Sequence, residues 1–169
     1  IRSCLVGSEM CIRDRNCAGL KEASSEEFDE KSNSSKDHLI YHLSKWIKDQ
    51  KVEIRSKVQN KGGTMRLGAY PAKIKKGTMA YSIYKKTIVS ERHRHRFEVN
   101  VNYQEALEDN GLTFSGFSQD GSLPEVVELS SHPFFLGVQF HPELKSKPFE
   151  PHPIFSNFIK KALEQTRLV

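Results

Sequence analysis

The sequence is poor in cysteine and has no long apolar run. Its 169 residues include one tryptophan and three cysteines, Cys4, Cys11 and Cys17. An odd cysteine set, clustered near one end, is a poor framework for disulfide bonds, and it lacks the C-x-x-C spacing of structural zinc sites. The reducing cytosol is the natural compartment for such a chain, and we expect no metal site.

Membrane and secretion signals are also missing. No apolar stretch approaches the ~18–20 residues that a membrane-spanning helix needs. Residues 1–16 carry Glu9, Asp14 and three arginines without an apolar segment, unlike a secretory signal peptide. The formal charge of +5 permits an anionic partner without requiring one. With 37% hydrophobic and 28% charged residues, the composition is that of one globular domain.

Helical and extended patterns alternate along the chain. Apolar residues at 39, 40, 43, 46 and 47 predict a helix after Asp37. Asn110-Gly111 predicts the end of a helix, and Asp120-Gly121 predicts a hairpin turn. Strands are expected at residues 65–74, 87–100, 112–117, 123–129 and 134–140, and helices at 78–84, 103–109 and 154–163. This mixture predicts an α/β domain.

The most informative motif is Gln139-Phe140-His141-Pro142-Glu143, which follows an apolar run. Reactive groups of open α/β sheets gather beyond the carboxyl ends of strands. Pro142 favours an extended His141, so His141 and Glu143 are expected to project from the same side. A histidine can take a proton from a thiol, and a carboxylate on its other nitrogen fixes the tautomer. The alternative is a surface histidine beside a turn proline.

The basic run at residues 92–96, Arg-His-Arg-His-Arg, has two interpretations. A basic string can bind nucleic acid. Strict alternation in a strand instead puts the arginines and Glu98 on one face, and His93, His95, Phe97 and Val99 on the other. No RNA-binding aromatic pattern accompanies the run. A structured strand that turns part of its basic residues into a site is therefore favoured.

Several motifs carry a family resemblance. Residues 139–143 (QFHPE) resemble the His/Glu motif of class I (triad) glutamine amidotransferases. Residues 62–70 (GGTMRLGAY) and 91–100 (ERHRHRFEVN) look like blocks of the CTP synthase family, and residues 152–155 (HPIF) also fit. The resemblance runs from Arg15 to the C-terminus. It implies an N-terminally truncated flavodoxin-like α/β/α sandwich, with residues 1–14 as a non-native or disordered leader and residues 15–169 as a partial amidotransferase domain.

The resemblance also implies a reaction and its residues. The family hydrolyses L-glutamine to glutamate and ammonia, and a synthase domain of the same polypeptide uses the ammonia to aminate UTP to CTP. His141 would be the general base and Glu143 its orienting carboxylate. Arg96 and Glu27 would bind glutamine, since a guanidinium suits its carboxylate and a carboxylate its ammonium group. ATP and magnesium would be bound by the synthase domain, with no cofactor in this segment. The parent would be a cytosolic homotetramer without nucleic-acid or membrane partners.

The N-terminus departs from the family pattern. The family's nucleophile is a cysteine in Gly-x-Cys-Leu-Gly, whereas residues 1–8 read IRSCLVGS. Only Cys4-Leu5 matches, which makes Cys4 a weak candidate and leaves the nucleophile unidentified. Residues 4–15 look like translated sequencing-adapter sequence. The chain alone is therefore expected to have negligible glutaminase activity and to be unable to make CTP.

Two rival functions stay open at this stage. A nucleophile-less module could retain Arg96 and Glu27 for glutamine binding or regulation. A basic nucleic-acid-binding domain would show salt-dependent affinity for single strands. A Gly-x-Cys-Leu-Gly sequence upstream of Arg15 in the parent gene would favour the enzyme over the module.

Overall fold

The structure, a computed structural model, describes residue 19, residues 24–25, 38–42, 45–48, 51–54 and 65–166. Cys4, Cys11, Cys17, Glu27 and the proposed leader at residues 1–14 lie outside the described residues.

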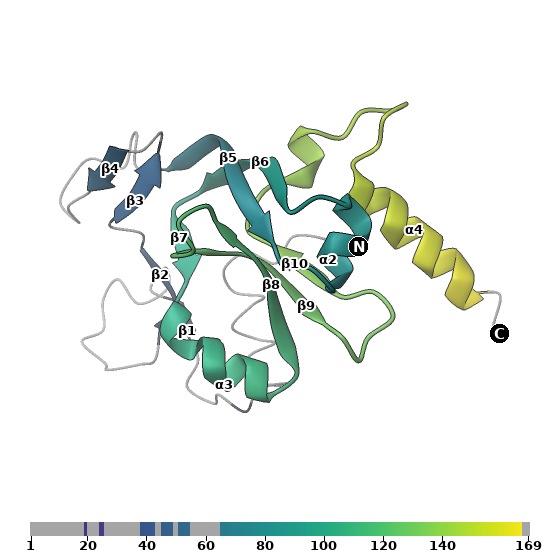
Figure 1. Cartoon of the computed structure of the whole chain (residues 1–169), viewed down its shortest axis with the longest axis horizontal. Coiled ribbons are helices and arrows are strands. Elements are labelled where there is room, and N and C mark those ends of the chain that lie inside the picture. Colours follow the sequence, from purple (N-terminus) through teal and green to yellow (C-terminus); the bar gives the residue numbers. More distant parts are fainter. Residues whose placement is uncertain are drawn as a thin grey trace.

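A five-stranded antiparallel sheet forms the centre of the described chain (Figure 1). Its strand order is β10–β9–β8–β5–β6. The bounds are β5 (Arg66–Ile74), β6 (Ile88–His95), β8 (Leu112–Ser118), β9 (Pro124–Leu129) and β10 (Leu136–Val138). The expected strands are all present here, although β10 is shorter than predicted and the run at 87–100 is broken at Arg96 into β6 and β7 (Phe97–Val99).

Two smaller sets of strands complete the described sheets. β1 (Ser24–Ser25), β2 (His38–His42) and β7 form a three-stranded sheet in which β1 and β2 run parallel. β3 (Lys45–Lys48) and β4 (Lys51–Ile54) form an antiparallel pair. The helix predicted over residues 39–47 is therefore wrong. Leu39 and Ile40 are adjacent and both buried, so β2 is covered on both faces, and such a strand has the same apolar pattern as a helical stripe.

In the part of the chain that the structure describes, three α-helices and two short 3₁₀ helices accompany the strands. They are α2 (Met79–Tyr84), η2 (Val101–Tyr103), α3 (Gln104–Asp109), η3 (Pro142–Leu144) and α4 (Pro153–Thr166). The carboxylate of Glu128 on β9 accepts hydrogen bonds from the backbone N–H groups of Met79 and Ala80, at 2.9 and 3.0 Å. This contact fixes the start of α2 against the sheet, because it satisfies donors that a helix leaves unpaired.

At β9 the sheet is covered on both faces. Val126 and Val127 are neighbours in β9, so their side chains point to opposite faces, and both are buried. Val126 packs with Ile83 of α2 and Ile154 of α4, and Val127 packs with Leu107 of α3. Figure 1 shows α2 and α4 side by side, with α3 at the other end of β8. The α/β class expected from the sequence is confirmed. In the described part of the chain, no helix is long and apolar enough to cross a membrane.

Candidate active site

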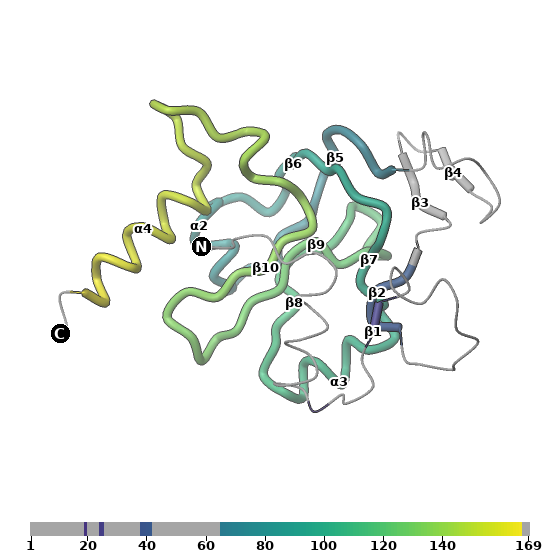
Figure 2. Tube along the Cα trace, turned by 180° about the vertical axis from the view of Figure 1, so that it is seen from behind, coloured from purple at the N-terminus to yellow at the C-terminus, as the bar shows by residue number. Residues whose placement is uncertain are grey.

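The segment that carries the His/Glu motif links the two ends of the sheet. The backbone N–H of Gln139 donates to the carbonyl of Glu125 on β9, at 3.0 Å. Two residues later, the N–H of His141 donates to the carbonyl of Arg92 on β6, at 2.8 Å. β10 and β6 are the two edge strands of the sheet (Figure 2). The hydrogen bond to Arg92 therefore fixes the backbone of His141 at the edge of the sheet opposite β10.

His141 and Glu143 lie in direct contact. The Nδ1 atom of His141 is 2.7 Å from Oε1 of Glu143. His141 is extended, with φ −110° and ψ 90°, as expected before a proline. Glu143 then lies in η3, where the 3₁₀ turn brings its carboxylate back to the ring. The predicted pairing of the two side chains is thus present, produced by a tight turn as well as by an extended His141.

The other ring nitrogen of His141 has the character of a base. Nε2 is buried and has no hydrogen-bond partner among the described residues. The Glu143 carboxylate only accepts hydrogen bonds, so it favours a proton on Nδ1 and leaves the Nε2 lone pair available. If Nε2 takes a proton, the same carboxylate stabilises the imidazolium. This arrangement suits proton transfer from a thiol or hydroxyl placed at Nε2.

A buried polar cluster lies behind this pair. It consists of charged and polar side chains from β5, β6, β7, β9 and the segment after β10, namely Arg66, His93, His95, Glu98, Glu125 and Gln139. Arg66 forms ion pairs with Glu98 at 3.2 Å and with Glu125 at 2.5 Å. Glu98 also contacts Nε2 of His95 at 2.6 Å and accepts a hydrogen bond from Gln139 at 3.1 Å. The cluster therefore ties the start of the His/Glu segment to four strands, β5, β6, β7 and β9.

The charges of the buried polar cluster do not balance without a bound proton. Arg66 supplies one positive charge against the carboxyl groups of Glu98 and Glu125. Burial raises the pKa of Glu125, and the attraction of Arg66 only partly offsets this effect. Burial, together with the positive charge of Arg66, lowers the pKa of His93. His93 is therefore neutral, and we expect Glu125 to hold the additional proton over much of the neutral pH range.

This proton gives a stability prediction. The carboxyl of Glu125 has its pKa raised from 4.5 to about 8, so between these values the folded chain binds more protons than the unfolded chain. The free energy of unfolding should therefore fall as pH rises across this interval, by at most about 1.4 kcal/mol per pH unit from this group. Urea unfolding of the wild-type chain and of Glu125→Gln at several pH values measures the effect. The difference between them should shrink or reverse with pH, and parallel curves would contradict the assignment.

The basic run at 92–96 is only partly as predicted. Arg92 and Arg94 are exposed, and His93 and His95 are buried, as strict alternation requires. Glu98 was expected on the arginine face, and this is wrong because the chain bends at Arg96 and resets the alternation. Arg96 is half-buried at that bend. Glu27, the other expected glutamine-binding residue, and the weak nucleophile candidate Cys4 lie outside the described residues.

Sequence reasoning missed several polar residues near the motif. Glu91 is buried on the same face of β6 as His93, where it forms an ion pair with Lys145 and lies 3.1 Å from Nε2 of His152. The alternation of faces along the strand could have found it. Glu91 lies between exposed Ser90 and Arg92, so its carboxylate is on the buried face of β6. Among the described residues, no group of three or more His, Cys, Asp or Glu side chains could hold a metal ion.

Comparison with known proteins gives consistent matches. The model of the glutamine amidotransferase class-I family matches residues 9–161. CTP synthase of Cereibacter sphaeroides (strain ATCC 17029 / ATH 2.4.9) is 53% identical over 97% of this chain, and that of Zymomonas mobilis is 54% identical over 98%. The chain spans 30% of the length of each. The solved glutaminase domain of Trypanosoma brucei CTPS with bound acivicin is 34% identical, with a TM-score of 0.73 over 94% of this chain and 58% of that one.

Proposed function

The chain belongs to the class-I glutamine amidotransferase family and is homologous to the glutaminase domain of CTP synthase, and we propose that its His141–Glu143 pair serves glutamine hydrolysis. The observation that carries the proposal is the contact of 2.7 Å between Nδ1 of His141 and Glu143, with Nε2 left without a partner among the described residues.

The proposed reaction uses the two ring nitrogens of His141, with Nδ1 held by Glu143 and Nε2 as the base. A cysteine thiol, which the described residues do not include, gives its proton to Nε2 of His141, and the thiolate attacks the side-chain amide carbon of glutamine. The imidazolium then protonates the departing nitrogen, so ammonia leaves and a thioester forms. Water, deprotonated by Nε2, attacks the thioester, which releases glutamate and restores the thiol. Glu143 stabilises each imidazolium state.

Arg96 is the proposed partner of the glutamine carboxylate, and Glu27 that of its ammonium group. Arg96 follows Arg92, whose carbonyl holds His141, by four residues. Arg96 therefore continues the stretch of chain that fixes His141, and this supports its assignment to the substrate of the same site.

The activity of a longer polypeptide is a further part of the proposal. The relatives named CTP synthase are more than three times longer than the matched segment, since the chain covers 30% of them. We expect the remaining polypeptide to bind ATP and magnesium, and to aminate UTP with the ammonia produced here. A homotetrameric, cytosolic enzyme of pyrimidine biosynthesis is expected on the same basis.

Substitutions of two nearby arginines, Arg96 and Arg94, test the substrate assignment. In the longer enzyme that carries this domain, Arg96→Gln should raise KM for glutamine at least tenfold, because a charge-assisted hydrogen bond to carboxylate is lost. Synthesis from added ammonia should not change. Arg94→Gln is the matched control, since Arg94 is exposed on β6 only two residues before Arg96. Equal effects of both substitutions would count against a specific role for Arg96.

A further inference from the structure

Glu91 gathers contacts from three separate parts of the chain. Its side chain is 1% exposed on the inner face of β6. Oε1 accepts from the Tyr84 hydroxyl at 3.1 Å and lies 3.1 Å from Nε2 of His152. Oε2 lies 3.2 Å from Nζ of Lys145. Tyr84 ends α2, His152 precedes α4, and Lys145 follows η3, so one carboxylate joins all three segments.

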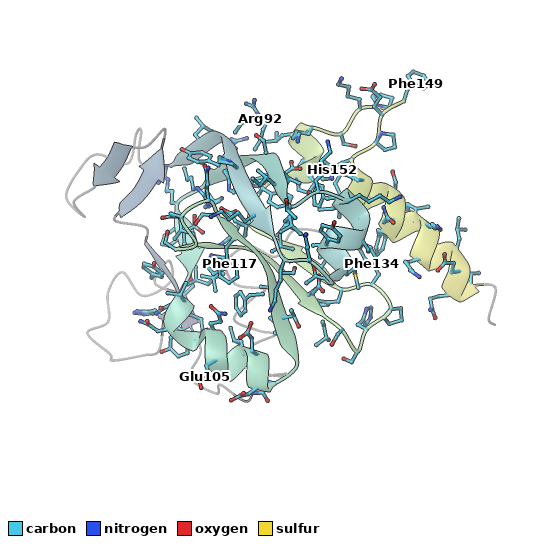
Figure 3. The ribbon with its side chains drawn as sticks, viewed as in Figure 1. Arg92, Glu105, Phe117, Phe134, Phe149 and His152 are labelled. Carbon is cyan, nitrogen blue, oxygen red and sulfur yellow. The ribbon has the colours of Figure 1, made fainter. Side chains whose placement is uncertain are left out.

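The loop between Lys145 and His152 closes on this carboxylate from both ends. The N–H of His152 donates to Oγ of Ser146 at 3.1 Å, and the N–H of Lys147 donates to the carbonyl of Glu150 at 3.1 Å. Figure 3 shows His152 where the loop meets α4 and Phe149 at its far tip. The ends of the loop are therefore fixed at Glu91, while its tip projects from the body of the domain.

The same contacts hold the turn that carries the proposed catalytic pair. His141 is tied to β6 through the carbonyl of Arg92, and Lys145 is tied to β6 through the carbonyl of Ser90 at 2.6 Å and through Glu91. Between these anchors, the N–H of Leu144 donates to the carbonyl of His141 at 3.0 Å. Both ends of the turn are thus held by three consecutive residues of one strand.

Glu143 depends on this anchoring for its position. Its side chain is 55% exposed, and it contacts the ring of His141 at 2.7 Å. A carboxylate so exposed has little packing to hold its rotamer, so the turn itself must place it. We propose that Glu91 is a positioning residue for the His141–Glu143 pair, acting through Lys145; this inference rests on the proposed function.

The charge state of Glu91 suits this role. Burial disfavours its ionised form, but the hydrogen bonds and charges of His152 and Lys145 outweigh burial and lower the pKa of Glu91. The carboxylate therefore stays ionised at neutral pH and attracts Lys145. Because Glu91 is buried, its ion pair is screened less by salt than an exposed pair of the same length.

Lys145→Met is the decisive variant, because the Lys145 side chain is 40% exposed and its loss should be compatible with folding. In the longer enzyme, kcat for glutamine hydrolysis should fall about tenfold to a hundredfold, since displacement of a catalytic group by ~1 Å has effects of this size. KM for glutamine and synthesis from added ammonia should not change. Lys145→Arg should restore most of the loss. Glu91→Gln keeps acceptors for Tyr84 and His152 and should act in the same direction.

The matched control is Lys147→Met, which removes an exposed ion pair with Glu150 from the same loop without touching β6. A second readout is independent of activity: ¹⁵N NMR of the His141 ring in this chain should show a single tautomer with the proton on Nδ1. Lys145→Met should give a mixture of tautomers, and Lys147→Met should not.

The outcomes separate this inference from the proposed function. If Lys145→Met leaves both kcat and the tautomer unchanged while His141→Ala abolishes hydrolysis, the positioning role is wrong and the proposed function stands. If His141→Ala retains full hydrolysis, the proposed function is wrong, and the positioning of a catalytic pair fails with it. A loss of kcat that Lys147→Met reproduces would also overturn the role of Glu91, because it would trace the effect to the loop charge.

Discussion

Replacing His141 by alanine in the longer enzyme should reduce glutamine-dependent synthesis by about 10³-fold or more, and leave synthesis from added ammonia intact. The magnitude follows from the loss of a general base that both activates the thiol and protonates the leaving nitrogen. Free ammonia needs neither step. Parallel assays with glutamine and with ammonium salt measure the two activities in the same preparation.

Another histidine of the chain provides the control. His132 is exposed in the loop between β9 and β10, where its Nδ1 accepts from the N–H of Phe134 at 3.2 Å. His132→Ala should therefore leave both activities unchanged. If His141→Ala lowers the ammonia-dependent and glutamine-dependent activities equally, the defect lies in folding or in domain assembly, and the assignment of His141 as base is wrong.

Glu143→Gln separates the charge of the carboxylate from its hydrogen bond. The amide oxygen of glutamine can still accept from Nδ1 of His141, which is 2.7 Å from the carboxylate. The negative charge that stabilises the imidazolium is absent, so the loss should be smaller than in His141→Ala but still at least tenfold. A Glu143→Gln enzyme with full glutamine-dependent activity would contradict the orienting role.

The parts of the fold that could be predicted are those set by local pattern. The alternation of buried and exposed residues in β5 and β6 follows from an edge hairpin with one solvated face, and it is readable in the sequence. The pairing of His141 with Glu143 was predictable for the same reason, since two residues and a proline determine it. Residues 39–47 show the limit: adjacent buried Leu39 and Ile40 suit a helix and a fully covered strand alike.

The polar groups behind the site could not be predicted, because they meet across long sequence separations. Arg66 contacts Glu98 and Glu125 across separations of 32 and 59 residues, and His152 contacts Glu91 across 61. No local period encodes such pairings. The bend at Arg96 adds a further shift, which moves Glu98 from the arginine face to the buried face. When strand alternation places a charged residue on the buried face, that residue must have a partner, but the alternation does not say which residue the partner is.

The largest stability effect is expected at Arg66, the only arginine or lysine among the six residues of the buried polar cluster. Arg66→Met should lower the free energy of unfolding of this chain by about 3–5 kcal/mol, because it leaves Glu98 buried without its counter-charge and Glu125 without its hydrogen-bond donor. Arg66 is 3% exposed and also lies 4.7 Å over the ring of Tyr70, so water cannot easily replace it. Urea unfolding at neutral pH measures the loss.

A double substitution distinguishes the charge effect from simple loss of packing. Adding Glu98→Gln to Arg66→Met removes the carboxyl that has lost its counter-charge, so the double variant should be more stable than Arg66→Met alone. Lys161→Met, which breaks an exposed pair with Glu164 on α4, should change stability by less than about 0.5 kcal/mol. If Glu98→Gln instead destabilises the Arg66→Met chain further, Arg66 stabilises the sheet by packing, and its role as the counter-ion of the cluster is wrong.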